Sequence, residues 1–298
     1  MNTQGDTYHT PVLIAEVLEN LAGPGTKKVI DGTLGDGGHT IEFAKRGIQV
    51  LAIDQDEEMI GRAKKRIADM GTEIEEKITI VHGNFADIET IARKNKFDEV
   101  DSILLDLGVS TYQLMSDTRG FSIKNGGTID MRMDQRLEHS AADIINSSSE
   151  DELYEIFTKF GEEHNSRSIA RRIVLARTVK KPIRTIEELI GIVEGKEGKY
   201  VGPIHHATKV FQALRIATND ELVHLNTVLP QTVQVLRKNG RVGVISFHSL
   251  EDRIVKRFMN DTENLRLVHK RPIVAGPEEQ RMNRRSRSAK MRIGEKYE

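Results

Sequence analysis

The chain has no cysteine. This absence excludes disulfide bonds, zinc sites with thiolate ligands, iron–sulfur clusters and a cysteine nucleophile. Also missing are a hydrophobic run long enough to span a bilayer and, in the N-terminal segment MNTQGDTYHT, the charged and apolar regions of a signal peptide. We therefore expect a cytoplasmic protein that makes no use of a membrane.

The chain also lacks a strong charge of one sign, because its net charge is −1 over 298 residues. Such a balance argues against a protein that is coated by a polyanion over its whole surface. Basic residues nevertheless gather in Arg167–Lys181 and in Arg281–Arg292. Local basic patches on a neutral body are typical of a protein that contacts phosphate groups with one face. Solvated helix surface is the alternative explanation of each run.

The N-terminal part of the chain has an α/β pattern. Apolar runs at 27–31, 48–54, 77–84 and 100–108 are predicted strands, and residues 39–47 and 56–71 have helical patterns. Asp56 is suited to cap the second helix, while Gly47 and Gly71 follow the two helix ends. Alternating strands and helices with continuous apolar strands predict a mostly parallel, Rossmann-like sheet that is covered on both faces.

The alternation stops after Gly108, and residues 113–204 show helical patterns without a convincing buried strand. Ser149 and Thr185 each begin a capping box with a glutamate three residues later. The sequence therefore predicts two domains. Residues 1–112 and 205–298 form a discontinuous α/β core, and residues 113–204 form an all-helical insertion for substrate recognition.

The sheet pattern resumes in the C-terminal third. Residues 209–240 are predicted to be mainly helical, with an interruption at Pro230 and an end at Asn239-Gly240. A buried strand is predicted at 241–248, and Ser249 is suited to cap the next helix. The tail from about Arg271 has little apolar periodicity and is expected to be an arm or a loop.

The segment DGTLGDGGHT, residues 31–40, places a glycine-rich turn between the first predicted strand and the first helix. Such turns let a ligand lie against bare backbone. Gly35 and Gly37 match the first two positions of the dinucleotide motif G-x-G-x-x-G, but Thr40 occupies the third, which disfavours a nicotinamide cofactor. S-adenosylmethionine carries no phosphate and is favoured, with Asp54 accepting from its ribose hydroxyls. A nicotinamide oxidoreductase stays open as a second hypothesis.

Asp106 ends the fourth predicted strand, in LLDLGVS. Ligands of open α/β sheets bind at the carboxyl ends of the strands, so the Asp106 carboxylate is expected beside the cofactor. A structural helix cap is the alternative role for this residue.

Blocks of sequence along nearly the whole chain resemble the bacterial 16S rRNA cytosine-N(4) methyltransferase family, known as RsmH or MraW. The blocks are YHTPVLIAEVL, DGTLGDGGHT, LAIDQD, HGNFAD, ILLDLGVSTYQL, RGFS, DMRMD, FQALRI, SFHSLEDRIVKRF and RSRSAKMR. The resemblance implies a class I S-adenosylmethionine-dependent methyltransferase fold with a helical domain inserted after the fourth strand. It also implies methylation of the exocyclic amine of a decoding-centre cytosine in small-subunit ribosomal RNA.

The resemblance also implies roles for single residues at the cofactor. It assigns Gly37, Gly38 and His39 to the methionine end, Asp54 to the ribose, Phe85 to the adenine, and Asp106 and Gln113 to the remaining polar edge; Gly35 belongs to the same binding loop. Other roles are open for some of them: the glycines can simply shape a turn, Phe85 can belong to the core, and His39 can simply begin a helix.

The chain departs from the family pattern at three places. Thr128-Ile129 replaces a usual Pro-Leu, residues 206–209 (HATK) replace Pro-Ala-Thr-Arg, and residues 283–285 (NRR) replace Asn-Pro-Arg. These changes spare the cofactor motifs and fall on the expected RNA side. A divergent paralogue that methylates another RNA cytosine therefore stays open, as does a non-catalytic RNA-binding protein of ribosome assembly.

Methyl transfer from a sulfonium to an amine requires in-line placement and a group that accepts from the N–H. Asp106, or a backbone carbonyl of the DLGV segment, is the predicted acceptor. Methylation of cytosine carbon five ordinarily needs a thiolate, so the absence of cysteine excludes that route. DLGV also replaces the Asn/Asp-Pro-Pro-aromatic motif of many DNA amine methyltransferases.

The expected partner is small-subunit ribosomal RNA or the assembled subunit, and a homodimer is left open. The target base is expected to be splayed out of its helix. Stacking candidates are Tyr112, Phe121 and Phe247. Phosphate and RNA candidates are Arg132, Arg167, Arg171, Arg172, His248, Arg284, Arg285 and Arg287. The spacing of the histidines gives no support for a metal site.

Overall fold

The computed structural model describes residues 8, 10–124, 126–179, 181–195 and 206–298. The chain folds into two compact units. We call Met1–Gly108 with Leu222–Glu298 the core unit, and Val109–Glu221 the helical unit. The predicted domain boundary at 204/205 lies outside the described residues.

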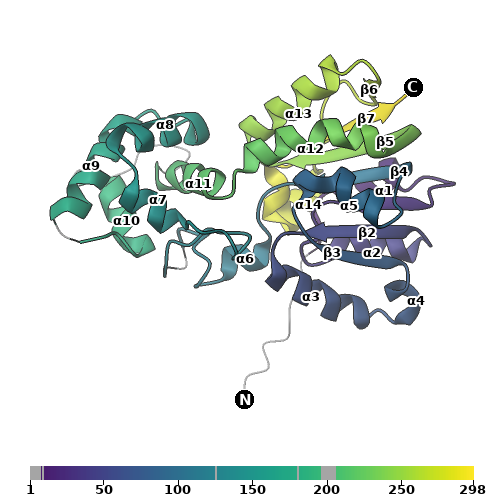
Figure 1. Cartoon of the computed structure of the whole chain (residues 1–298), viewed down its shortest axis with the longest axis horizontal. Helices are drawn as coiled ribbons and strands as arrows, with labels where there is room; N and C mark the ends of the chain where they lie inside the picture. Colours follow the sequence, from purple (N-terminus) through teal and green to yellow (C-terminus); the bar gives the residue numbers. More distant parts are fainter. Residues whose placement is uncertain (1–7, 9, 125, 180, 196–205) are drawn as a thin grey trace. The chain divides into compact units, whose positions relative to one another are not determined.

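The core unit contains a seven-stranded sheet in the order β3-β2-β1-β4-β5-β7-β6 (Figure 1). The strands are β1 (Lys28–Asp31), β2 (Gln49–Asp54), β3 (Ile78–His82), β4 (Val100–Asp106), β5 (Leu236–Ser246), β6 (Leu265–Leu267) and β7 (Lys290–Lys296). Strands β1 to β5 run parallel, and β7 is antiparallel to both of its neighbours. The strand order changes direction between β1 and β4, which is where ligands of doubly wound sheets bind.

Helices cover both faces of this sheet (Figure 1). One face carries α1 (Ile14–Leu21), α2 (Gly38–Lys45) and α3 (Glu57–Ala68), with α4 (Thr72–Glu75) beside them. The other face carries η1 (Phe85–Asp87), α5 (Ile88–Lys94), α12 (Glu221–Val235) and α13 (Ser249–Asp261). Successive residues of β2 alternate between the two cores: Val50 and Ala52 belong to the first, Leu51 and Ile53 to the second. The predicted two-sided α/β fold is therefore confirmed.

The C-terminal tail is not the predicted arm or loop. It forms α14 (Pro277–Met282), η2 (Arg284–Arg287) and β7, which pairs with β5 and β6 inside the sheet. Its hydrophobic pattern is weak because two charged residues are buried in β7, each neutralised by an ion pair. Arg292 donates to Asp252 at 2.7 Å, and Glu295 accepts from Arg241 at 2.8 Å.

Three further local predictions need correction. Helix α12 continues through Pro230, because its apolar face packs on the sheet and outweighs the missing hydrogen bond. The helix ends at Val235, and β5 already begins at Leu236, ahead of the predicted stop at Asn239-Gly240. His248, rather than Ser249, is the N-cap of α13. The predicted caps Asp56, Ser149 and Thr185 are confirmed.

The helical unit contains α6 (Thr111–Met115), α7 (Ala141–Ser147), α8 (Glu150–Gly161), α9 (Ser166–Val179), α10 (Ile186–Glu194) and α11 (His206–Thr218). Its apolar core is its own and includes Phe157, Ile173 and Leu214. Helices α8 and α11 cross closely at Gly161, where a Cβ atom would lie 2.8 Å from the Lys209 carbonyl oxygen. Among the described residues of this unit, β-pairing is limited to an isolated bridge between Thr128 and Thr185.

None of the helices in the described part of the chain combines the length and the hydrophobicity that a membrane span requires.

Candidate active site

The glycine-rich segment forms the turn between β1 and α2. Gly35 and Gly37 have φ angles of +52° and +77°, which L residues with side chains rarely adopt. A Cβ atom on Gly35 would meet only the Thr33 carbonyl oxygen within 4 Å, so the backbone is open there. A Cβ atom on Gly38 would instead lie 2.4 Å from Pro11 Cγ. The predicted bare-backbone surface is therefore centred on Gly35, while Gly38 is needed for packing.

Asp31 at the end of β1 holds this turn from inside. Its Oδ1 accepts from the Thr33 backbone N–H at 3.1 Å, and its Oδ2 accepts from the Thr40 hydroxyl at 2.7 Å. Burial raises the pKa of the Asp31 carboxyl above its ordinary value, an effect that the nearby His39 opposes. Thr40, which replaces the third motif glycine, thus has a definite role. In the dinucleotide motif Thr40 counts only as a missing glycine, because its hydrogen bond to Asp31 is not visible in the sequence.

Asp54 ends β2 and faces the same turn. Its Oδ2 accepts from the Gly35 N–H at 2.8 Å, and its Oδ1 accepts from the Asp56 N–H at 2.9 Å. Burial raises the pKa of the Asp54 carboxyl to about 6. Each carboxylate oxygen keeps a second lone pair, so the group can also accept from two hydroxyls of a ligand.

His39 and Asp106 face each other across the end of the β1–α2 turn. The Asp106 N–H donates to Thr33 Oγ1 at 2.7 Å, and His39 Nε2 lies 3.6 Å from Asp106 Oδ2. Both ring nitrogens of His39 and Asp106 Oδ1 are buried without a hydrogen-bond partner. Unsatisfied buried polar atoms are rare and cost about 1–3 kcal/mol each. Three of them together indicate a site that is completed by a ligand.

Phe85 lies in η1, directly after the turn that follows β3. The preceding Asn84 donates to Gln55 Oε1 at 3.0 Å and contacts His224 Nδ1 at 3.1 Å. The His224 ring meets the Phe85 ring edge-on, with 6.4 Å between centroids. The sequence gives no signal for Gln55, Asn84 and His224. Gln55 and Asn84 are ordinary polar residues of the segments LAIDQD and HGNFAD, and His224 lies far along the chain on α12.

Gln113 belongs to the helical unit. It forms a capping box with Ser110, whose N–H donates to Gln113 Oε1 at 2.8 Å. Its predicted contact with the cofactor stays a prediction.

Comparison with known proteins matches this chain to the MraW methylase family over residues 6–297. The chain belongs to the MraW methylase family. It is 46% identical to Ribosomal RNA small subunit methyltransferase H of Deinococcus deserti, over 99% of this chain and 95% of that protein. The corresponding protein of Trichormus variabilis is 45% identical, over 97% of this chain and 92% of that protein. The family that was inferred from the sequence motifs is therefore confirmed.

A solved structure of an rRNA methylase from Streptococcus thermophilus has a TM-score of 0.43 and 11% identity to this chain, over 96% of this chain and 92% of that one. The strand order of the core unit, with its antiparallel β7, is that of the class I methyltransferase fold.

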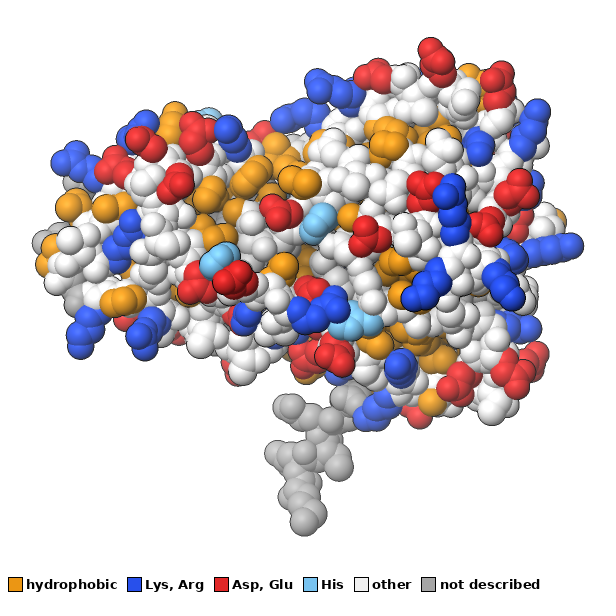
Figure 2. Space-filling view, in the orientation of Figure 1, with side chains coloured by type: hydrophobic (Ala, Val, Ile, Leu, Met, Phe, Trp, Pro, Cys, Tyr) orange, Lys and Arg blue, Asp and Glu red, His pale blue; other side chains and the backbone are white. Residues whose placement is uncertain are grey.

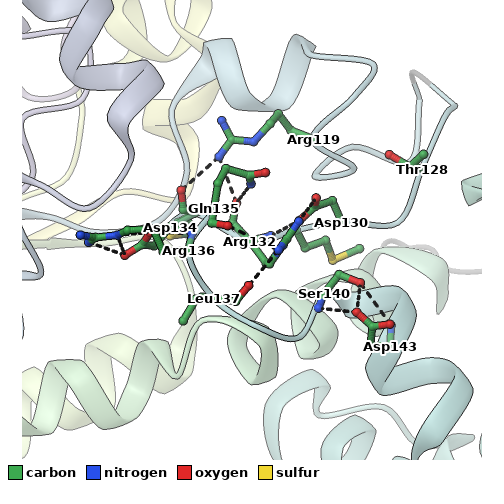
Figure 3. Close-up of polar contacts among 12 residues, drawn as sticks. Arg119, Thr128, Asp130, Arg132, Asp134, Gln135, Arg136, Leu137, Ser140 and Asp143 are labelled. Carbon is green, nitrogen blue, oxygen red and sulfur yellow. Dashed lines mark hydrogen bonds and ion pairs between the residues drawn. The ribbon is translucent and has the colours of Figure 1, made fainter.

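Arg132, a predicted RNA contact in this MraW family member, is engaged within its own loop (Figure 3). Its guanidinium donates to both carboxylate oxygens of Asp130, at 2.8 and 2.9 Å, and to the Leu137 carbonyl at 2.8 Å. Arg119, on the same loop system, donates to the backbone carbonyls of Arg132 and Met133. Arg132 therefore shapes the segment 130–137, and a contact with RNA stays a prediction.

The three predicted arginines of α9 differ in their surroundings. Arg167 pairs with Asp151 and lies over the Tyr154 ring, 4.0 Å from its centroid. Arg172 donates to the Val193 carbonyl at 2.7 Å and fastens α9 to α10. Arg171 is exposed. Among these residues, Arg171 is therefore the candidate best placed to meet a phosphate.

The C-terminal candidates are three arginines of η2 and His248, which follows β5. The Arg285 guanidinium lies 5.3 Å from the centroid of the Phe247 ring, and Arg287 donates to the Gln280 carbonyl at 3.1 Å. Arg284 is exposed, whereas His248 Nδ1 accepts from the Glu251 N–H at 3.4 Å as the cap of α13. On the face drawn in Figure 2, positive and negative side chains are interspersed. Binding of RNA through these residues stays a prediction.

Proposed function

We propose that this protein transfers a methyl group from S-adenosylmethionine to the exocyclic N-4 amine of a decoding-centre cytosine in small-subunit (16S) ribosomal RNA, in the cytoplasm. The observation that carries the proposal is the arrangement at the β1/β4 switch point. There the open backbone at Gly35, the Asp54 carboxylate and the unpartnered atoms of His39 and Asp106 lie at one edge of the sheet. Membership of the MraW methylase family and the names of the relatives support the same reaction.

The described residues fit this donor. When bound, S-adenosylmethionine supplies a methyl group on a positively charged sulfur. The turn at Gly35 and Gly37, with the unpartnered Nδ1 of His39, would receive its amino-acid end. Asp54 would accept from the ribose hydroxyls with its remaining lone pairs, and Phe85 would lie against the adenine. Thr40, bonded to Asp31, leaves no third motif glycine for a pyrophosphate.

Asp106 would accept from the amine that is methylated. The cytosine N-4 lone pair is delocalised into the ring, so an acceptor on the N–H favours the pyramidal nitrogen that attacks. Asp106 Oδ1 is buried and has no protein partner, which suits this role. A hydrogen bond to a charged group is worth about 1.5–3 kcal/mol, or about one to two decades in rate. Positioning would supply the remaining acceleration.

The helical unit would recognise the substrate. Arg171 there and Arg284 in the core unit are exposed cations that could contact the phosphate backbone. The changes at Thr128 and His206 fall in the helical unit, and the change at Arg284 falls on the C-terminal segment. If the protein methylates a different RNA cytosine, these positions would be the ones that change which RNA it recognises.

The test uses small ribosomal subunits, and separately naked 16S RNA, from a strain that lacks the gene. Each is incubated with the purified protein and isotopically labelled donor, and the modified nucleoside is mapped by mass spectrometry. We expect one N-4-methylated cytidine in the decoding centre. A methylated cytidine elsewhere would favour the divergent paralogue, and RNA binding without any transfer would favour a non-catalytic assembly protein. Protection of the protein against melting by a nicotinamide dinucleotide, but not by S-adenosylmethionine, would overturn the proposal.

A further inference from the structure

Three ionisable side chains from separate elements meet beneath the glycine-rich turn. Asp31 ends β1 with 1% of its surface exposed, His39 lies in the first turn of α2 with 6% exposed, and Asp106 ends β4 with 19% of its side chain exposed. His39 interacts with Asp31 through charge and lies 3.6 Å from Asp106. A buried imidazole therefore lies close to the Asp106 carboxylate and within the electrostatic influence of Asp31.

Hydrogen bonds hold the Asp31 carboxylate and the Asp106 backbone, whereas the His39 imidazole has no hydrogen bond. Asp31 accepts from Thr33 and Thr40, and Thr33 in turn accepts from the Asp106 backbone N–H. The His39 nitrogens have no partner. A histidine kept only for structure normally satisfies at least one ring nitrogen. The arrangement therefore leaves His39 able to take up a proton beside an acid that is already positioned.

The charged surroundings of His39 are mainly negative. Asp31 and Asp106 face it from β1 and β4. On the α3 side, Arg66 Nη1 lies 3.5 Å from the position of a Cβ atom on Gly38, but it donates to the Asp36 carbonyl and the guanidinium lies over the Tyr8 ring. Arg66 is thus engaged by other groups, and the carboxylate that lies 3.6 Å from His39 Nε2 is that of Asp106.

We propose that His39 stores the proton that the reaction releases, receiving it through Asp106. The proposal rests on the function proposed above. As the amine lone pair forms the new carbon–nitrogen bond, the electron pair of the carbon–sulfur bond stays on sulfur. One N–H proton passes to Asp106 Oδ1, and the carboxyl group then rotates about its Cβ–Cγ bond and gives that same proton to His39 Nε2. The products are the neutral methylated amine, the thioether, the Asp106 carboxylate and the imidazolium, which later loses its proton to water.

His39 acts here through Asp106 and does not touch the amine. An imidazole is intrinsically a stronger base than a carboxylate, so it is the better final holder of the proton. Asp106 alone would return its proton to the product amine or wait for solvent to reach a buried atom. The His39–Asp106 pair thus separates two tasks, contact with the amine and storage of the proton.

The kinetic test compares His39→Gln and His39→Ala, with His269→Gln as the control. Glutamine can place an amide N–H near Asp106 but cannot accept a proton, whereas exposed His269 lies on another part of the core unit. We expect both His39 variants to slow single-turnover methyl transfer by about 100-fold or more, within the range of general acid–base effects. Donor affinity, measured by calorimetry, should change less than about tenfold. The variants' rate should rise with pH where the wild-type rate levels off, because solvent base must then remove the proton.

A second measurement does not depend on turnover. In ligand-free protein labelled with nitrogen-15, the His39 ring resonances are assigned by their absence from His39→Gln. We expect the Nε2 resonance and its pH response to change in Asp106→Asn and to stay unchanged in the surface control Asp261→Asn.

Full activity in His39→Gln would show that His39 serves only as a hydrogen-bond donor and would overturn the proposal. Loss of donor affinity by more than about 100-fold with an unchanged transfer rate would assign His39 to donor binding alone and would also overturn it. A wild-type protein that transfers no methyl group would instead contradict the proposed function. In that case the resonance experiment still decides whether His39 and Asp106 are coupled.

Discussion

At the scale of single residues, Asp54 is expected to make donor binding depend on pH. Burial raises the pKa of its carboxyl to about 6, and only the ionised form can accept from both ribose hydroxyls. Protonation occurs as the pH falls through this value, so affinity should be constant well above it and should weaken below it. We expect about tenfold weaker binding for each further unit of pH, which calorimetric titration with S-adenosylmethionine would measure.

Asp54→Asn and Asp252→Asn provide the controls for this prediction. The amide cannot titrate, so Asp54→Asn should bind weakly at every pH without a slope. Asp252 lies on α13 and pairs with Arg292, which lowers the pKa of its carboxyl. Its asparagine variant should keep the wild-type slope near pH 6. Equal affinity of the wild type at about pH 5 and pH 7.5 would contradict a role for ionised Asp54.

At the scale of elements, we expect a side chain to be poorly tolerated at Gly32 in the β1–α2 turn and well tolerated at Gly61 in helix α3. A Cβ atom on Gly32 would lie 2.5 Å from Leu105 Cδ2 and 3.4 Å from Phe85 Cβ. We expect Gly32→Ala to lower the free energy of unfolding by about 1–3 kcal/mol, as overpacking does. Gly61 lies inside α3 with nothing within 4 Å of its Cβ position. Gly61→Ala should therefore stabilise the protein by about 0.5–1 kcal/mol.

Urea unfolding of both variants checks this pair, and the donor affinity of each refolded protein is measured beside it. Because Phe85 lies next to the added methyl group, Gly32→Ala should also weaken donor binding. If the urea midpoint of Gly32→Ala equals that of the wild type, the β1–α2 turn accommodates the methyl group without loss of stability, which would contradict the prediction.

The elements that the sequence predicted well are those with a continuous apolar run or with apolar residues at helical spacing. β2, β4 and α3 have such patterns, and their ends carry recognisable acids at Asp54, Asp106 and Asp56. β7 was missed because Arg292 and Glu295 are buried in it as ion pairs, which no hydropathy pattern reveals. These pairings join residues far apart in the chain, so they exist only after the sheet has formed.

The residues of the candidate site also fall into those that the sequence could predict and those that it could not. Glycines and acids at strand ends could be found from spacing alone, because they act through the backbone or at the strand tip. The role of Thr40 depends on its distance to Asp31, and that of His224 on contact with Asn84 and Phe85. Neither distance is encoded by neighbours in the sequence. The hydrogen bonds of the Arg132 guanidinium within its own loop could not be read from the sequence either. The contact of Arg132 with RNA stays a prediction.

At the scale of the whole molecule, the net charge of −1 means that attraction to RNA must come from a few local cations. Each phosphate contact releases counterions, so the logarithm of the binding constant falls linearly with the logarithm of salt concentration. Arg171 and Arg172 are adjacent on α9. Arg171 is exposed, whereas Arg172 is partly buried and donates to the Val193 carbonyl. The two residues are therefore a matched pair for separating RNA contact from fold stability.

We expect Arg171→Ala to weaken RNA binding about equally across sequences and to reduce the salt slope by about one, without changing the unfolding midpoint. Arg172→Ala should instead destabilise the helical unit by about 1–3 kcal/mol, because the Val193 carbonyl loses a charged donor. Fluorescence anisotropy with a 16S RNA fragment at several salt concentrations, together with urea unfolding, measures both effects. An unchanged salt slope in Arg171→Ala would remove this face of α9 from the RNA interface, and the phosphate contacts would then be sought at Arg284 in the core unit, whose alanine variant is measured in the same titration.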